Sequence, residues 1–240
     1  MRVVQQARAV PADGTIRLLL VGHWTPRKGI LEALAALRQV SVSVVLELVG
    51  EQDRDLQYAA QVREALRDPL LAGRVRVHGR LPDDALAALY HEVDALLLPS
   101  SHEGYGMVLA EGLAAGLPII ATRVGAIPEV VRDGLEAELV TPGDAAALAQ
   151  AIRRLAGNPA DRASRSKLAQ ERAWSLPAWA ESIAAFARLL DGLGAGVMAG
   201  AGAGGVSGVD AGGASVARSG VAAGAEIGDA SGGASRVGAG

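Results

Sequence analysis

The sequence predicts an α/β protein built on a doubly wound, mostly parallel sheet, and three observations support this fold class. Short apolar runs alternate with helical patterns from Thr15 onward, an order typical of βα units. Most of the runs are nearly continuous Leu, Val and Ile, as in strands that helices cover on both faces. Pro and Asp residues mark helix starts, as at Pro82 followed by Asp83 and Asp84, and at Asp144.

The elements can be placed in order along the chain. Strands are expected at residues 16–21, 44–49, 75–78, 95–99, 118–121 and 137–140. Helices are expected between them, at residues 28–38, 55–67, 82–92, 106–115 and 126–132. Further helical patterns at 145–156, 159–171 and 177–190 trail behind the last strand, which completes a Rossmann-like domain. Ligands of such sheets bind beyond the carboxyl ends of the strands, so we look for a site in the loops at 22–28, 50–55, 79–82 and 99–106.

Composition divides the chain into a domain and a tail. Of the 31 glycines, 17 lie after Leu190, where residues 192–240 are mostly Gly, Ala, Ser and Val. Such a segment cannot bury enough apolar surface to offset its ordering entropy, so we expect it to be disordered. Residues 15–191 are long enough for one domain with its own core.

Charge and residue usage exclude several function classes. The net charge of -3 comes from mixed acidic and basic residues without a basic block, so nucleic acid is not expected as a partner. The absence of Cys excludes disulfides and thiolate sites and fits a reducing compartment. No apolar run is long enough for a transmembrane helix, and residues 1–14 lack the apolar stretch of a signal peptide. We therefore expect a cytoplasmic protein, with peripheral membrane contact left open.

The strongest motif follows the fourth predicted strand, where Glu103 and Glu111 bracket the turn Gly104-Tyr105-Gly106 at a helix start. A helix N-terminus reached through glycines offers unpaired N–H groups to a diphosphate. The carboxylates could accept hydrogen bonds from neighbouring hydroxyls of a sugar or ribose. The alternative is that both glutamates are ordinary surface residues.

The whole segment resembles a known family. The chain has Glu103-Gly104-Tyr105-Gly106, then Glu111, then Ala115-Gly116-Leu117-Pro118, then Gly125-Ala126-Ile127-Pro128-Glu129. The same order of motifs is found in the C-terminal, donor-binding domain of retaining GT-B glycosyltransferases, which this segment therefore resembles. The family concerned is the large family 4, also called group 1. That family includes sucrose synthases and bacterial mannosyl- and glucosyltransferases. The resemblance covers about residues 15–190, and it implies one half of a GT-B fold.

The resemblance also implies roles for these residues. Glu103 would contact and orient the transferred sugar, Gly104 to Gly106 would contact sugar and phosphate, and Glu111 would hold the ribose hydroxyls. We include Met107, the next residue, among the donor-binding positions. The donor substrate implied is a nucleoside diphosphate sugar, its sugar is transferred with retention, and no metal or other cofactor is expected.

A second motif, at residues 21–30, follows the first predicted strand. A Lys at a helix start could neutralise the charge on a departing diphosphate, although Arg27 and Lys28 could also be a solvated helix-start pair. By resemblance, Lys28 matches the phosphate-binding lysine of the family. His23 stands where the family usually has Arg, so it either has a weakened form of that role or has none, and phosphate binding would rely more on Arg27 and Lys28.

Other positions are less specific. Gly79-Arg80-Leu81 matches a loop that touches the nucleotide base in relatives, or it is an ordinary turn. Trp24, Trp174 and Trp179 are expected to pack the trailing helices, or to have packed a second domain. His78 and His91 are expected to be structural.

The family's N-terminal acceptor domain has no counterpart before residue 15, so residues 1–14 are interpreted as a linker remnant. The acceptor domain is then expected as a separate partner, or the chain is an incomplete enzyme. The alternative function is a non-catalytic nucleotide-sugar-binding module or an inactive fragment. A nicotinamide-dependent dehydrogenase is disfavoured because no GxGxxG turn follows the first strand, and no P-loop GK[ST] is present.

Overall fold

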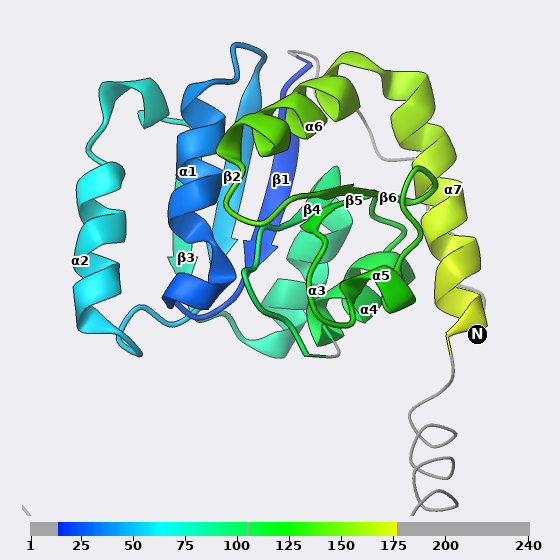
Figure 1. Cartoon of the computed structure of the whole chain (residues 1–240), viewed down its shortest axis with the longest axis horizontal. Helices are drawn as coiled ribbons and strands as arrows, with labels where there is room; N and C mark the ends of the chain where they lie inside the picture. The colour runs from blue at the N-terminus through cyan, green and yellow to red at the C-terminus, as the bar shows by residue number, and fades with distance from the viewer. Residues whose placement is uncertain (1–13, 105, 177–240) are drawn as a thin grey trace, which may run out of the picture. The chain divides into compact units, whose positions relative to one another are not determined.

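A six-stranded parallel sheet forms the centre of the computed structural model, which describes residues 14–104 and 106–176. Its strands lie in the order β3-β2-β1-β4-β5-β6 (Figure 1). They are β1 Ile16–Val21, β2 Val44–Val49, β3 Val75–Gly79, β4 Ala95–Leu98, β5 Ile119–Thr122 and β6 Ala137–Val140. The predicted strands match these within one residue at each end, and the predicted doubly wound sheet is confirmed.

Helices connect the strands and follow the last one. They are α1 Ile30–Arg38, α2 Leu56–Ala65, α3 Asp83–Glu92, α4 Met107–Ala114, α5 Ile127–Val130, α6 Ala145–Gly157 and α7 Pro159–Ser175. Two short 3-10 helices precede α1 and β3, namely η1 Pro26–Lys28 and η2 Pro69–Leu71. The pattern at 177–190 lies outside the described residues, as do Trp179 and the glycine-rich segment.

The strand side chains alternate between two apolar layers, one on each face of the sheet. Leu18, Leu20, Leu46 and Leu48 pack against buried residues of α1, α2 and α6. The opposite face presents residues such as Leu19, Leu96 and Leu98 to α3, α4, α5 and α7. Burial on both faces explains why these strands are nearly continuous apolar runs.

The strand order reverses between β1 and β4, because the chain crosses from one half of the sheet to the other there. This is the topological switch point, where the loops after two adjacent strands diverge and leave a crevice for a ligand. The loops concerned are the ones after β1 and after β4. Both strongest sequence motifs therefore lie at the same place in the fold.

Two local predictions can be compared with the structure. The helix expected at 28–38 is interrupted because Gly29 takes a left-handed conformation with φ 66°, which separates η1 from α1. Trp24 is buried in the apolar layer to which α1, α2 and α6 contribute, and the centre of its ring lies 5.8 Å from the guanidinium carbon of Arg63. Trp174, on α7, is exposed.

Candidate functional site

Lys28 is held at the switch point by two glycines. A Cβ on Gly22, directly after β1, would lie 2.9 Å from Cδ of Lys28, so the glycine gives room for the lysine stem. A Cβ on Gly29 would lie 2.0 Å from the carbonyl oxygen of Pro99, so η1 packs closely on the end of β4. Lys28 is only 7% exposed as a result. The interpretation of Lys28 as a solvated helix-start residue is therefore wrong, whereas Arg27 is half-exposed.

Glu103 is held by the loops after β4 and β5. Thr122 donates from its hydroxyl to the carbonyl of Ser100, and the Ser100 hydroxyl lies 3.3 Å from Oε2 of Glu103. Gly125 has φ 51°, and a Cβ there would lie 1.9 Å from the carbonyl oxygen of Glu103. The glycine of the second half of the motif therefore allows close packing against the glutamate of the first half.

The structure brings Lys28 and Glu103 into direct contact. Nζ of Lys28 lies 2.7 Å from Oε2 of Glu103, and Nη1 of Arg27 lies 4.0 Å from the same oxygen. The Glu103 side chain is 11% exposed, so the pair is shielded from water and its hydrogen bond is charge-assisted. An ammonium has three donors. Lys28 can therefore keep Glu103 and also bind an anion placed in the crevice.

The turn after Glu103 ends at the start of α4. Gly106 is the N-cap residue, in a left-handed conformation with φ 75°. Gly104 and Met107 are exposed, and Tyr105 lies outside the described residues. Because the first N–H groups of a helix have no intrahelical partner, this end of α4 can receive a negatively charged group.

Glu111 lies one turn further along α4, on an exposed position. Its Oε2 accepts a hydrogen bond from the hydroxyl of Tyr90, at 2.7 Å, and Tyr90 is itself buried in α3. A Cβ on Gly112, the next residue, would lie 2.8 Å from Cδ2 of Leu96, so α4 packs closely on β4 at this level. The sequence motif indicated Glu111 but not Tyr90.

The remaining predicted residues form a second group. His23, Arg80 and Leu81 line a pocket of about 310 Å³ at the carboxyl ends of β1 and β2. Within the described residues, no hydrogen bond or ion pair joins these three residues to Lys28, Glu103 or Glu111. The predicted site therefore has two parts, and the loop after β1 contributes Lys28 to one and His23 to the other.

Glu51, which lies in the predicted ligand-binding loop at residues 50–55, is the centre of the second part. Its carboxylate accepts from Nε of Arg54 at 2.6 Å and pairs with Arg80 at 3.3 Å and with Nδ1 of His23 at 3.5 Å. The hydrogen bond from Arg54 is the main cause that lowers the pKa of Glu51 below its ordinary value. The pocket thus combines a carboxylate with the guanidinium groups of Arg54 and Arg80 and the ring of His23.

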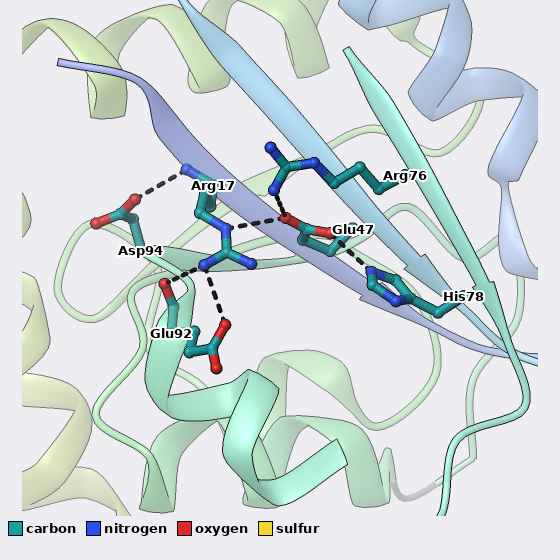
Figure 2. A network of polar contacts seen from close by, with 6 residues as sticks. All are labelled: Arg17, Glu47, Arg76, His78, Glu92 and Asp94. Carbon is teal, nitrogen blue, oxygen red and sulfur yellow. Dashed lines mark hydrogen bonds and ion pairs between the residues drawn. The ribbon is translucent and has the colours of Figure 1, made fainter. Parts of the chain in front are cut away.

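A polar network outside the predicted motifs lies within the sheet. Figure 2 shows Arg17, Arg76 and His78 converging on Glu47 from the strands on either side of β2. The distances to the Glu47 oxygens are 2.9 Å from Arg17, 3.0 Å from Arg76 and 2.7 Å from His78. Arg17 also bonds Glu92 and, through its backbone N–H, Asp94. The predicted structural role of His78 is consistent with this contact.

The described part of the chain contains no group of three His, Cys, Asp or Glu side chains arranged to hold a metal ion. None of its helices has the length and apolar character needed to cross a membrane.

Comparisons with known proteins bear on the family and the fold. The family model described as "Glycosyl transferases group 1" matches residues 15–158, which include β1 to β6 and both parts of the site. Glycogen synthase of Mycobacterium tuberculosis is 33% identical over 165 residues, which are 68% of this chain and 39% of that protein. The chain therefore spans about two fifths of the length of this relative.

Two solved structures resemble the fold. Sucrose-phosphate synthase from Thermosynechococcus elongatus superposes with a TM-score of 0.68 at 31% identity, over 78% of this chain and 47% of that one. HepE from Anabaena, solved in complex with UDP-glucose, superposes with a TM-score of 0.62 at 24% identity, over 69% and 49% of the two chains. The second likeness concerns the fold alone.

Proposed function

Because this chain belongs to the glycosyl transferases group 1 family, we propose that it binds a nucleoside diphosphate sugar and presents the sugar for transfer with retention of anomeric configuration. The described residues would form the donor-binding domain. Since the matched region makes up only 39% of the glycogen synthase, the acceptor would bind to a further domain or partner.

The observation that best supports the proposal is the contact between Lys28 and Glu103, at 2.7 Å across the switch point. It places a cation suited to a diphosphate beside a carboxylate suited to sugar hydroxyls. No hydrogen bond to the second oxygen of Glu103 occurs within residues 14–104 and 106–176, so acceptor sites stay available for a sugar. One ligand with adjacent phosphate and sugar groups would satisfy both residues.

The chemistry proposed for these residues is electrostatic. Transfer breaks the bond between the anomeric carbon and the diphosphate oxygen, and negative charge develops on the departing diphosphate. The ammonium of Lys28 and the N-terminus of α4 at Gly106 would stabilise that charge in the transition state. Glu103 would orient the sugar through remote hydroxyls, and the mechanism needs no metal.

The nucleoside would contact both parts of the site, with its ribose at one part and its base at the other. Glu111 would accept hydrogen bonds from the ribose hydroxyls, and the pocket lined by His23, Arg80 and Leu81 would receive the base. UDP-glucose is a sensible first ligand because the HepE structure contains it, although that likeness concerns the fold alone.

The test is isothermal titration of the 240-residue chain with UDP-glucose, GDP-mannose and ADP-glucose. We expect saturable binding of one nucleotide class. Lys28→Ala should weaken it by about 30-fold, as expected for the loss of a charge-assisted contact. Lys167→Ala is the matched control, because Lys167 is the other lysine of the sequence and is exposed on α7.

Each outcome has a consequence. If the folded chain binds none of the three nucleotide sugars, the proposal is wrong. Equal affinity of the Lys28→Ala and Lys167→Ala variants for the nucleotide sugar would show that Lys28 does not contribute to binding. Binding without transfer, even after a partner domain is supplied, would favour a non-catalytic nucleotide-sugar-binding module.

A further inference from the structure

Tyr90 contacts Glu111 of the candidate site from the apolar layer on one face of the sheet. It lies in α3 and is 5% exposed, and its ring packs in the apolar layer with Leu89, Val93 and Leu113. Its hydroxyl reaches the surface of that layer and donates to Oε2 of Glu111 at 2.7 Å. A buried, rigid aromatic side chain thus fixes one oxygen of an exposed carboxylate.

The Tyr90 hydroxyl can donate to Glu111 as long as it is protonated. Burial is the main cause that raises the pKa of Tyr90 above its ordinary value of 10.0, and the hydrogen bond to Glu111 adds to it. The hydroxyl therefore keeps its proton at neutral pH and can donate to Oε2 of Glu111. Within residues 14–104 and 106–176 no hydrogen bond engages Oε1 of Glu111.

Fixing Glu111 matters because a free glutamate side chain samples several rotamers. Ordering such a side chain on binding costs conformational entropy, and a pre-formed hydrogen bond removes part of that cost. A helical side chain leans toward the N-terminus of its helix. We therefore expect Glu111 to lean toward the Gly106 end of α4, where the proposed diphosphate would lie.

We propose that Tyr90 is a positioning residue that fixes the Glu111 carboxylate for the paired hydroxyls of a ribose. The site would then select ribonucleotides over nucleotides that lack these hydroxyls. This inference rests on the proposed function and deepens it, because it assigns sugar selectivity to a residue outside the Glu103–Glu111 motif.

The experiment compares Tyr90→Phe with the wild-type chain by isothermal titration with UDP, GDP and ADP, each beside its 2′,3′-dideoxy counterpart. Phe keeps the buried ring and removes the hydroxyl. We expect about tenfold weaker binding of the ribonucleotide, as for one hydrogen bond to a charged group, and unchanged binding of the dideoxynucleotide. In a Glu111→Ala background, Tyr90→Phe should have no further effect.

Tyr58→Phe is the matched control. Tyr58 is equally buried, and its hydroxyl accepts from the N–H of Leu31, away from Glu111. This variant should bind ribonucleotides as the wild type does.

The outcomes separate this inference from the proposed function. If the wild type binds no nucleoside diphosphate, the proposed function fails and the inference fails with it. If the wild type binds but Tyr90→Phe leaves the affinity unchanged, only the inference fails. Equal losses for ribo- and dideoxynucleotides would show that Tyr90 merely supports the packing of α3 and α4, which also overturns it.

Discussion

Glu47 in β2 and Glu103 after β4 are two shielded carboxylates that contact cations, and they differ in exposure and in how many of their oxygens have partners. Glu47 is 0% exposed and uses both oxygens, with Arg17 and Arg76 on one and His78 on the other. Glu103 has its described partners on a single oxygen and is 11% exposed.

The difference follows from position in the sheet. Glu47 lies in the middle of a strand between two other strands, so neighbouring side chains surround it. Glu103 lies past the carboxyl end of β4, where adjacent loops diverge. A carboxylate whose acceptor sites are filled links strands together, whereas one with acceptor sites left over can bind a ligand. The following predictions test whether the two sites divide stability and binding in this way.

The largest effect on stability is expected at Glu47. Glu47→Ala should reduce the free energy of unfolding by about 3 kcal/mol, because it leaves Arg17 and Arg76 close together without their carboxylate. Urea denaturation would measure it. A loss below about 1 kcal/mol would show that solvent replaces the partner and that the network does not hold the strands.

Gly125→Ala is expected to affect both properties. The substitution forces a Cβ to 1.9 Å from the carbonyl oxygen of Glu103 and requires a side chain at φ 51°. We expect a stability loss of about 2 kcal/mol from the strained backbone and displaced loop. Nucleotide binding should weaken as well, because Glu103 moves. Gly143→Ala is the control, since Gly143 has φ 78° but no atom within 4 Å of the added Cβ.

The double variant Lys28→Met with Glu103→Gln should change binding far more than stability. It removes both charges of the pair while keeping similar shapes, so the free energy of unfolding should change by less than about 1 kcal/mol. Affinity for the nucleotide sugar should fall at least about tenfold. A stability loss as large as that of Glu47→Ala would contradict the division between the two glutamates.

The smallest expected effect is on the pH dependence of stability in acid. Burial alone would raise the pKa of Glu47, but hydrogen bonds from His78 and Arg17 and the charges of Arg17 and Arg76 lower it below its ordinary value of 4.5. Its stabilising contribution is therefore present above that value and is lost as pH falls through the lowered pKa. Thermal unfolding from pH 7 to pH 3 should depend less on pH in Glu47→Gln than in the wild type. Parallel curves would exclude Glu47 as a source of acid sensitivity.

The elements that could be predicted are those that depend on residues close together in the sequence. The six strands are apolar runs bounded by turns, and the motif around Glu103 lies at one loop. The break at Gly29 was missed because the helical pattern is continuous through it, and only a left-handed φ separates η1 from α1. The predicted boundaries of the tail and the assigned ligand roles stay predictions.

The polar partners were missed for a different reason. Glu47 is a single acid in an apolar run, and its partners lie 29 to 31 positions away on other strands. Tyr90 is 21 positions from Glu111 and looks like any core aromatic. Which residues meet depends on strand register and helix packing. A useful signal was present at Glu47, since a lone carboxylate in a buried strand requires cations on its neighbours.

The strand order also has a consequence for how the protein folds. Lys28 and Glu103 are 75 positions apart, and they meet only after β4 has paired with β1. Strands β1 to β3 can associate earlier, since each pairs with the next in the chain. Until β4 arrives, one edge of β1 presents unpaired backbone groups, which are prone to pairing with other chains. The contact between Lys28 and Glu103 is therefore completed only when β4 joins the first three strands, and the same event covers this edge of β1.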